Sequence, residues 1–549
     1  MKRLFQFIIA AFIASGACSK AEPSAPSGGG GSAVDFADSG HYAPAAQATL
    51  LEKTAHDYFR YYWDECHPVS YMARIGTSRP ANTVALAGSA YAVTALPVAV
   101  ERGWITYAQG AERFAEVCRF LDRAERYHGA WSHWMNGTTG QGLPFNASQQ
   151  SAGDLVETAF MMMGLLVCSE YFDRGGSDEA EAIALTEKFW GEIEWNFYTN
   201  GGDTLCWAWD KELGFAPLKI TGPNEALPVY LLALAAPAEH AVPASLFDTG
   251  WRGGARYYNP GRTTYGYRFE LGSAAQGGPL FTTQHPFLWL DPARLQDDYA
   301  DYWEVCTHHA LINRHYCLNE APRTYGYDAG NWGLSACYGP SPKNYKGRSP
   351  SNDDGVLCTT AAIGAIAQTP YYALQALRSI NARPELNGIY GPVDSYSPVD
   401  DWQDDRYLSI NVMPVVSIIE NYRSGLIWRL AMRNAKIIRG LELAGFSAPR
   451  YAEGFCQMPV NSVDATVDLV AHPDRGCYSL HFWLDTDGAS VSLELLADDG
   501  RTIWTDMLQT ISRGINTVEI PYEDIAKGSY EAILQIGNRT KNTLKIRLR

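Results

Sequence analysis

The stretch Ser151-Ala-Gly-Asp154-Leu-Val-Glu157-Thr-Ala-Phe-Met-Met-Met-Gly-Leu-Leu places two carboxylates at the start of an otherwise apolar segment. Asp154 and Glu157 are three residues apart, so on a helix both point to the same side. The residues after Glu157 have no polar face, which predicts a helix buried on all sides. Acidic side chains at the start of such a helix indicate a pocket floor. The structural alternative is a capping box, with Ser151 as N-cap and Asp154 at the third helical position, which leaves Glu157 unexplained.

A helical period dominates the chain from about Leu50 to Phe446. Some of the expected helices are apolar throughout and others are amphipathic, which favours a two-layer helical barrel with inner helices wrapped by outer ones. In such a ring the starts of the inner helices open on one face, where the loops build one cleft. The expected helices are Leu51–Asp64, Val84–Arg102, Tyr107–Arg126, Asp154–Phe172, Glu179–Trp195, Glu225–Ala235, Pro292–Ala310, Thr359–Ala367, Tyr371–Ile380, Val415–Arg433 and Ala435–Ala444.

Further acidic residues stand at or before expected helix starts. They are Glu225 after Gly222-Pro-Asn, Asp353 and Asp354 in Ser351-Asn-Asp-Asp-Gly, and Asp401, Asp404 and Asp405 before the helix near Asn411. Complementation of the helix dipole explains each acid taken alone. It does not explain the large side chains in the intervening loops, which indicate the lining of a site. These are His133, Trp134, Trp207, Trp209, His285, Trp332 and Tyr407.

The N-terminus has the pattern of an export signal. Lys2 and Arg3 precede the apolar run Leu4 to Ile13, which is too short for a permanent membrane anchor. The sequence Ser15-Gly16-Ala17-Cys18 is similar to a bacterial lipoprotein cleavage site, with Cys18 as the lipidated residue and Ser15 where an aliphatic residue is usual. Residues 1–18 are therefore expected to be a signal peptide and residues 19–48 a flexible tether. We expect an exported lipoprotein, tethered to the membrane in the periplasm or at the cell surface.

The composition narrows the class of partner. A formal net charge of -16 argues against nucleic acid. The 16 Trp and 32 Tyr favour a carbohydrate ligand, although a large core also consumes aromatic residues. The eleven Cys show no CxxC spacing, which argues against zinc, and Asp353 with Asp354 lacks the spacing of an EF-hand calcium loop. We expect no cofactor and no metal, and a monomer.

After Phe446 the pattern changes to short alternating segments separated by turns that contain glycine. The clearest segments are Tyr478–Leu484, Ser490–Leu496, Thr517–Ile520 and Tyr530–Ile536. This pattern predicts an antiparallel β-sandwich over residues 448–549, following a helical domain over residues 49–447. No aromatic stripe marks the sandwich as a sugar-binding module, so an accessory or packing role is expected.

Several motifs together resemble the bacterial glucoamylase-like family. They are His128-Gly-Ala-Trp-Ser-His-Trp-Met-Asn-Gly137, Asp154-Leu-Val-Glu-Thr-Ala, Gly222-Pro-Asn-Glu-Ala, Gly278-Pro-Leu-Phe, Tyr299-Ala-Asp-Tyr-Trp, Leu311-Ile-Asn-Arg314, Asn331-Trp-Gly-Leu, Ser351-Asn-Asp-Asp-Gly and Ile419-Glu-Asn-Tyr-Arg423. The characterised members form glycoside hydrolase family 144, which cleaves β-1,2-glucans. The resemblance implies an (α/α)6 barrel and an inverting hydrolase in which Asp154, Glu157 and Glu225 line the cleft.

Two positions depart from the family pattern. Gln150 stands where an acid is expected four residues before Asp154, and Asn411-Val412-Met413 replaces the usual Asp-Gln-Gly. Both changes are expected beside the cleft, so they put the linkage specificity and the base in question. Two alternatives stay open for this reason: a hydrolase of another glycan linkage on the same scaffold, and a glycan-binding lipoprotein without catalysis.

An inverting glycosidase needs a protonated acid and an ionised base roughly 6.5–9.5 Å apart. We expect Glu225 to be the acid and either Asp154 or Asp405 the base, with Glu157 holding sugar hydroxyls or orienting Asp154. A helix N-terminus lowers a carboxyl pKa, so burial or a neighbouring carboxylate must outweigh it at Glu225.

The expected contacts with an oligo- or polysaccharide substrate are His133, Trp134, Trp209, His285, Arg314, Trp332, Asp353, Tyr407 and Asn411. For each single aromatic residue or histidine, a purely structural role is an equal alternative. Arg314 has the further alternative of an internal ion pair.

Overall fold

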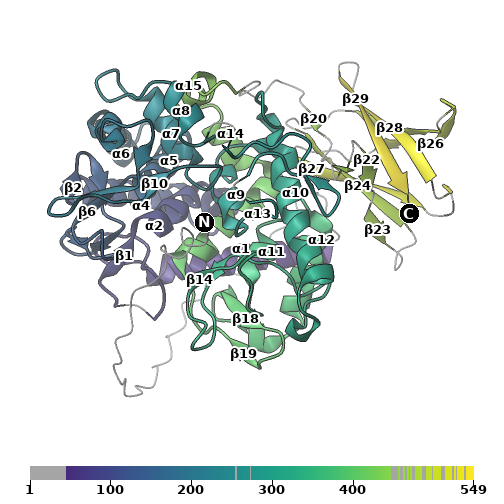
Figure 1. Ribbon diagram of the computed structural model, residues 1–549, viewed down its shortest axis with the longest axis horizontal. Helices are drawn as coiled ribbons and strands as arrows, with labels where there is room; N and C mark the ends of the chain where they lie inside the picture. Colours follow the sequence, from purple (N-terminus) through teal and green to yellow (C-terminus); the bar gives the residue numbers. More distant parts are fainter. Residues whose placement is uncertain are drawn as a thin grey trace.

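The computed structural model describes residues 45–446, except 79, 254, 255 and 273, and a series of segments between 456 and 548. The predicted signal peptide, Cys18 and nearly all of the predicted tether lie outside the described residues. Figure 1 shows the helices gathered in one larger body, with the strands of the last part of the chain on one side of it. The described chain is mostly helical, as the sequence predicts.

One group of helices is enclosed by protein on almost all sides. It comprises α2 (Leu86–Thr94), α5 (Leu155–Tyr171), α7 (Leu227–Ala235), α11 (Thr359–Ile363) and α13 (Ser409–Ser424). α2 packs against α5 and α13, α5 packs against α7, and α11 packs against α13. These helices are apolar around most of their circumference, so burial on every side is favourable.

The other helices surround this group. They are α1 (Ala45–Glu65), α3 (Leu96–Glu101), α4 (Tyr107–Arg123), α6 (Ser177–Glu192), α8 (Ser245–Thr249), α9 (Phe281–Phe287), α10 (Tyr302–His315), α12 (Pro370–Asn381), α14 (Leu426–Ala431) and α15 (Ala435–Leu443). α4 packs against α6, α1 against α13, and α15 against α7. Single turns complete the helical part: η1 (Trp195–Thr199), η3 (Pro292–Arg294), η4 (Tyr316–Glu320), η5 (Arg323–Tyr325) and η6 (Pro384–Leu386).

Short strands run directly into three of the enclosed helices. β1 (Thr83–Ala85) leads into α2, β6 (Ala152–Asp154) into α5, and β15 (Leu357–Cys358) into α11. Each belongs to a small antiparallel sheet, in the orders β1-β4-β5, β6-β8-β9 and β15-β18-β19. The ladder keeps the backbone extended up to the last paired residue, so it fixes where each helix begins. The partner strands are β4 (Trp134–Asn136), β5 (Gly142–Leu143), β8 (Ala208–Asp210), β9 (Gly214–Phe215), β18 (Ser395–Ser397) and β19 (Trp402–Gln403).

Five further two-stranded ribbons lie in the loops: β2 (Arg126–Tyr127) with β3 (Ala130–Trp131), β7 (Leu205–Cys206) with β10 (Lys219–Ile220), β11 (Thr263–Thr264) with β12 (Tyr267–Arg268), β13 (Ala336–Cys337) with β14 (Lys346–Gly347), and β16 (Asn387–Gly388) with β17 (Gly391–Pro392).

Three expected helices differ from the observed ones. The segment Val84–Arg102 divides into β1, α2 and α3, and Pro97 lies in the first turn of α3, where a missing N–H costs least. The expectation for Pro292–Ala310 is wrong at its start, because α10 begins only after Asp301, whose carboxylate caps it. The expected helix Val415–Arg433 is two helices, separated by Gly425 in the left-handed region with φ 66°. The pattern did not predict α9, which contains Pro286.

The last part of the chain forms two sheets. One contains β20 (Cys456–Gln457), β23 (Val470–His472), β24 (Cys477–Leu484) and β27 (Gly514–Pro521), and the other contains β21 (Ser462–Val463), β22 (Thr466–Asp468), β25 (Val491–Leu496), β26 (Thr502–Leu508), β28 (Gly528–Ile536) and β29 (Thr540–Leu548). All pairs are antiparallel except β22 with β29. The four strands predicted here are present, with ends shifted by a few residues.

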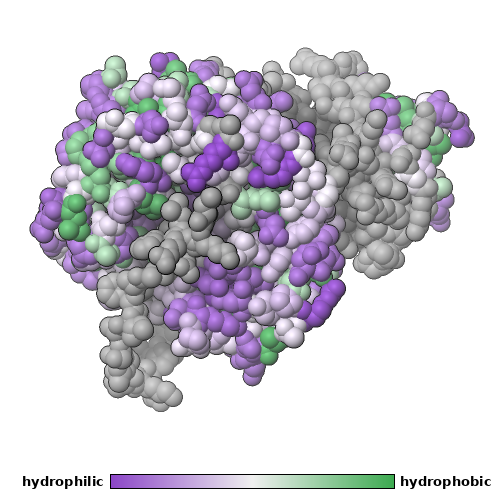
Figure 2. Space-filling model, in the orientation of Figure 1, coloured by the Kyte–Doolittle hydropathy of each residue, from purple (hydrophilic) through white to green (hydrophobic). Residues whose placement is uncertain are grey.

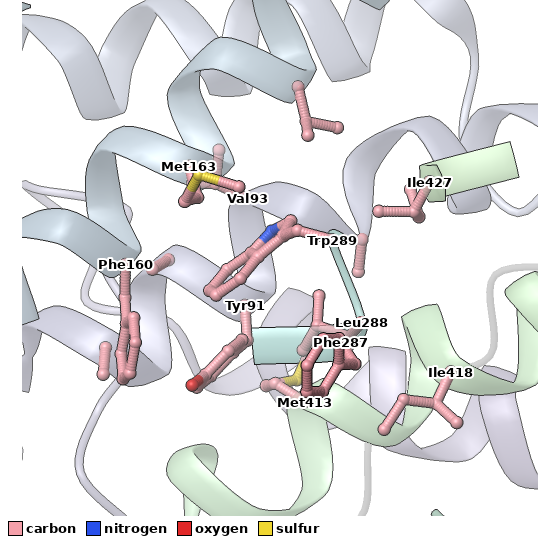
Figure 3. Close-up of a cluster of buried hydrophobic side chains, with 14 of the residues drawn as sticks. Tyr91, Val93, Phe160, Met163, Phe287, Leu288, Trp289, Met413, Ile418 and Ile427 are labelled. Carbon is pink, nitrogen blue, oxygen red and sulfur yellow. The ribbon is translucent and has the colours of Figure 1, made fainter. Parts of the chain in front are cut away.

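Apolar side chains fill the space between the enclosed helices. Figure 3 shows Tyr91, Phe160, Trp289 and Met413 in one cluster. The rings of Tyr91 and Trp289 are stacked with centroids 5.2 Å apart, and Trp289 Nε1 donates to Thr94 Oγ1 at 2.9 Å. The core is therefore continuous between α2, α5 and α13.

A buried ion pair ties the end of α3 to α13. Arg102 Nε and Nη2 donate to the two carboxylate oxygens of Glu420 at 2.7 and 2.8 Å. Glu420 is 3% exposed, so this bidentate pair lies in a medium where charges interact strongly.

The cysteines at positions 66, 118, 168, 206, 306, 317, 337 and 358 are free thiols. Cys118 and Cys168 are buried within the helical core, as predicted from their apolar surroundings. The remaining three, Cys18, Cys456 and Cys477, lie outside the residues whose side chains the structure describes.

The face shown in Figure 2 is mostly hydrophilic, with apolar residues in small separate groups. In the part of the chain that the structure describes, no helix combines the length and the apolar character needed to cross a membrane.

Candidate active site

Asp154 stands where β6 ends and α5 begins. β6 pairs with β8 in the register Asp154 with Ala208, so the chain is extended as far as Asp154. Its Oδ1 accepts from the backbone N–H groups of Val156 and Glu157, both at 3.1 Å, and Asp154 is therefore the N-cap of α5. The alternative of a capping box that starts at Ser151 is wrong, because the strand ladder holds residues 152–154 out of the helix.

The other oxygen of Asp154, Oδ2, accepts hydrogen bonds from side chains of three loops. Oδ2 lies 3.0 Å from His133 Nδ1, 3.2 Å from Trp207 Nε1 and 3.4 Å from Gln149 Nε2. With the two backbone bonds, both carboxylate oxygens are occupied. Asp154 therefore orients its neighbours, and these five hydrogen bonds leave its oxygens without a free site for a hydrogen bond from water.

Glu157 lies one turn further along α5 and is 7% exposed. Its Oε2 accepts from the backbone N–H of Ala87 at 2.5 Å, and its Oε1 is 3.6 Å from His133 Nδ1. Burial raises the pKa of Glu157 to about 7; His133 opposes the rise, while the charges of Asp154 and Glu225 support it. At neutral pH this carboxyl therefore exists in both protonation states.

His133 links the two acids of α5. Its ring is stacked on Phe145, with centroids 3.5 Å apart and an interplanar angle of 14°. Burial lowers the pKa of His133, but the carboxylates of Glu157 and Asp154 raise it more, so the net shift is upward. The structure therefore gives His133 a bridging role, instead of the predicted role of a direct sugar contact alone.

Glu225 approaches from the segment before α7. Asn224 Oδ1 accepts from Ala226 N at 3.0 Å and forms the turn that presents the Glu225 side chain. Burial of this half-buried carboxyl raises its pKa to about 7. Glu225 precedes Ala226, the N-cap residue, so it stands before the helix that it was expected to begin. Its charge contributes to the raised pKa of Glu157, which puts the two carboxyl groups within electrostatic range of each other.

The acids before α13 differ from one another. Asp405 is exposed, while Asp404 is 2% exposed and its Oδ1 accepts from Arg406 Nε at 2.6 Å. Burial raises the pKa of Asp404 although Arg406 lowers it.

Trp332 and Tyr407, two of the predicted substrate contacts, are core residues. Trp332 is 2% exposed and its Nε1 donates to the carbonyl of Tyr372 at 3.4 Å. Tyr407 is 3% exposed and its hydroxyl donates to the carbonyl of Gly391 at 2.8 Å. Both side chains are covered and hold the loops together, which favours the structural alternative for each; their contact with a sugar stays a prediction.

Two further predicted substrate contacts, Trp134 and Trp209, lie in different surroundings. Trp134 is half-buried and meets Phe145 edge to face, which places it beside His133. Trp209 instead packs against Phe197 and His128, and its neighbour Trp207 is the one that reaches Asp154.

His285 and Arg314 lie on α9 and α10. The His285 ring is 5.0 Å from that of Tyr91, and burial lowers the pKa of His285 to about 3, so it is neutral. The guanidinium of Arg314 lies 3.8 Å from the centre of the Tyr372 ring. This stacking favours a structural role for Arg314.

Asp353 and Asp354 serve different partners. Asp353 accepts from the hydroxyls of Tyr327 at 2.8 Å and Tyr316 at 3.3 Å. Asp354 forms ion pairs with Arg348 at 2.7 Å and Lys346 at 3.0 Å. Both carboxylates are therefore engaged by other side chains of the protein, and these contacts hold the loop before β15 in place. In the described residues no cluster of three or more His, Cys, Asp or Glu could hold a metal ion.

The two departures from the family pattern have protein partners of their own. Gln150 is exposed and its Nε2 donates to the carbonyl of Asn146 at 2.6 Å. Asn411 is 9% exposed and its Nδ2 donates to Ala336 O at 3.0 Å and Asp394 Oδ1 at 2.8 Å.

Val412 and Met413 are fully buried in the core, where Figure 3 shows Met413. The expectation that these two replacements border the cleft is therefore wrong, because the α13 backbone turns their side chains inward.

Three residues near the acids, Gln149, Phe145 and Tyr91, carry no sequence signal that alone marks them as site residues. Gln149 and Phe145 belong to the loop before β6, whose course the pattern does not define. Tyr91 lies in an apolar helix, where a core role is the ordinary expectation. The one available signal is that Tyr91 follows Ala87 by four residues, so both lie on one face of α2. This spacing indicates a place near Glu157 only after the structure shows that Glu157 accepts from the N–H of Ala87.

Together the fold and the site define a mainly helical protein with a carboxylic-acid centre at the starts of its enclosed helices. The profile of the family described as "Putative glucoamylase" matches residues 217–435. A "putative glucoamylase" from Bacteroides uniformis is 38% identical with a TM-score of 0.71, over 74% of this chain and 99% of that one. An "endo-beta-1,2-glucanase" from Chitinophaga pinensis, solved with sophorotriose and glucose, is also 38% identical, with a TM-score of 0.69 over 73% of this chain and 99% of that one.

A curated relative from Parabacteroides distasonis, named "exo beta-1,2-glucooligosaccharide sophorohydrolase (non-reducing end)", is 31% identical over 422 residues. The match covers 73% of this chain and 58% of the relative, so the chain spans less than two thirds of that protein. The chain belongs to the bacterial glucoamylase-like family, of the glycoside hydrolase family 144 type. The resemblance seen in its motifs is thereby confirmed.

Proposed function

We propose that this protein is an inverting glycoside hydrolase that acts on β-1,2-linked glucan or on sophorooligosaccharides. One observation carries the chemistry: the carboxyl groups of Glu157, on α5, and Glu225, on the segment before α7, lie within electrostatic range, and burial raises the pKa of each to about 7. Such a pair supplies one proton donor and one proton acceptor at neutral pH. The names of the Parabacteroides and Chitinophaga relatives support β-1,2-glucan as the substrate.

Glu225 is the proposed general acid. A general acid at this position needs burial to raise its pKa, and burial raises the pKa of Glu225 to about 7. The carboxyl gives its proton to the glycosidic oxygen as the bond from that oxygen to the anomeric carbon breaks. Water attacks the anomeric carbon from the opposite face, so the β-linkage yields an α-anomer.

Glu157 is the proposed base, which takes a proton from the attacking water. Asp154 was a candidate for this role, but its oxygens already accept five hydrogen bonds. We propose that Asp154 instead holds His133, and through it the carboxyl of Glu157, in position. Asp405 is the other candidate for the base. If Glu157 is the base, Asp405→Asn is expected to leave kcat within a few-fold of the wild type. If Asp405 were the base, the same replacement would abolish turnover.

The proposed architecture follows the same family. Residues 49–447 form an (α/α)6 barrel, which is supported by the mutual packing of α2, α5, α7, α11 and α13. Residues 448–549 form an accessory β-sandwich, supported by the two sheets of that segment. We expect a monomer in solution, which light scattering would test.

The anchoring proposal rests on the sequence alone. Cys18, after Ser15-Gly16-Ala17, is proposed as the lipidated first residue of an exported, membrane-tethered bacterial protein, in the periplasm or at the cell surface. Metabolic labelling with a radioactive fatty acid is expected to mark the wild type in the bacterial host and to leave Cys18→Ala unlabelled. Labelling of both proteins would refute the assignment.

The decisive test of activity is a panel of linkage-defined glucans, with the products separated by chromatography and their anomers followed by NMR. Release of sophorooligosaccharides as α-anomers supports the proposal. Glu225→Gln is expected to lower kcat by a factor of about 10²–10⁴. Cleavage of only another linkage would identify a hydrolase of a different glycan. Binding without turnover, unaffected by Glu225→Gln, would identify a binding protein.

A further inference from the structure

The phenol of Tyr91 is fully buried and firmly held beside the acid pair. It belongs to α2 and is 0% exposed. Its ring is stacked on Trp289 at 5.2 Å and lies 5.0 Å from His285 and 5.8 Å from Phe160. With neighbours on several sides, the ring has little freedom to turn away, as Figure 3 shows for the labelled side chains.

The Tyr91 hydroxyl has no hydrogen-bond partner among the described residues. A buried hydroxyl without a partner is costly, and native proteins retain few of them. The charged groups that act most strongly on it are carboxyls: burial raises the pKa of Tyr91, and the charges of Glu157 and Glu225 raise it further. Both acids therefore act electrostatically on this hydroxyl, and the packing of the helices indicates which of them it meets.

The geometry of α2 favours Glu157 as the partner of Tyr91. The backbone N–H of Ala87 donates to Glu157 Oε2, and Tyr91 is four residues further along the same face of α2. On α5, Phe160 is three residues after Glu157 and contacts the Tyr91 ring. The packing of α2 against α5 thus places Tyr91 and Glu157 at the same helix–helix contact. The oxygen of Glu157 that does not accept from Ala87 is Oε1.

We propose that Tyr91 is a positioning residue whose hydroxyl donates to Glu157 when that carboxyl loses its proton, so that α2 holds the ionised base with two donors. This inference rests on the proposed role of Glu157 as the base. A hydrogen bond to the charged form of an acid favours that form, so Tyr91 keeps Glu157 ionised at a lower pH than it would otherwise be.

The test is Tyr91→Phe, which removes one oxygen and keeps the ring. The matched control is Tyr58→Phe, because Tyr58 is equally buried but its hydroxyl faces Thr359 and Asp394. On β-1,2-glucan we expect Tyr91→Phe to lower kcat about tenfold with KM within twofold. The acidic limb of its kcat/KM profile should move upward by about one pH unit. The control should show neither change.

Four other titratable groups could also shift the acidic limb of the kcat/KM profile. They are Asp154 and His133 near Glu157, and Glu225 and His285 near Tyr91. Infrared titration of the carboxyl groups in the free protein separates them, with Glu157→Gln identifying the Glu157 band. This readout needs no substrate, so it stands even if no β-1,2-glucan is hydrolysed.

An unchanged Glu157 midpoint in Tyr91→Phe would overturn the proposal. A raised KM with an unmoved pH profile would also overturn it and assign Tyr91 to sugar binding. An upward shift of the Glu157 midpoint without any turnover would support the contact and refute the proposed function.

Discussion

Replacement of Glu225 by Gln should change how stability depends on pH. Burial raises the pKa of Glu225 from 4.5 to about 7, so the folded protein holds a proton that the unfolded chain has already lost. The favourable contribution is complete below pH 4.5 and is lost as the pH rises through 7. The difference in pKa corresponds to about 3 kcal/mol, which partial solvent access reduces to about 2 kcal/mol.

Gln is neutral throughout, so Glu225→Gln should not suffer this loss. We expect the free energy of unfolding of the wild type to fall by about 2 kcal/mol more than that of the variant between pH 4.5 and 8. Urea unfolding of both proteins at several pH values measures the difference, in which the other titrating groups cancel except Glu157, whose raised pKa Glu225 supports in small part. Glu239→Gln, at an exposed glutamate, should run parallel to the wild type. Parallel curves for Glu225→Gln and wild type would show that Glu225 is not perturbed by burial.

Three further variants test the assignments above. Trp332→Ala should cost about 3–5 kcal/mol of stability and leave KM unchanged; a raised KM at undiminished stability would restore it as a sugar contact. Glu420→Gln should cost about 3–5 kcal/mol in urea unfolding, because it removes the bidentate partner of the Arg102 guanidinium, whose side chain is only 15% exposed; a loss below 1 kcal/mol would contradict the pair's burial. Asn411→Asp sets a second carboxyl against Asp394, so its melting temperature should fall below that of the wild type as the pH rises; equal melting at pH 8 would show that the two groups do not meet.

The sequence predicted the long, strongly periodic helices well. The run after Asp154 is apolar on every side and is buried as α5 from Leu155 to Cys168. Helix boundaries depended on tertiary contacts instead. The pattern could not show that pairing with β8 keeps residues 152–154 extended, so that α5 has a single cap at Asp154 and the alternative of a capping box from Ser151 fails.

The site was only partly predictable for a related reason. Asp154, Glu157 and Glu225 were selected because carboxylates at the start of buried helices are unusual. The roles of Trp332 and Tyr407 could not be assigned, since an aromatic residue in a loop can face a ligand or close the core with equal ease. Neither could the contribution of Tyr91, because its proposed partner Glu157 is distant in sequence.

The filled core between α2, α5 and α13 restricts how a long polymer can use this site. Tyr91, Trp289 and Met413 close the interior beyond the acids, so no tunnel leads through the helical body at this point. Under the proposed function, a glucan therefore reaches and leaves the acids on the side away from these three residues. A chain cannot be threaded past them through the helical body, so an enzyme with the proposed function would release the chain, or let it slide along the surface, between successive cuts.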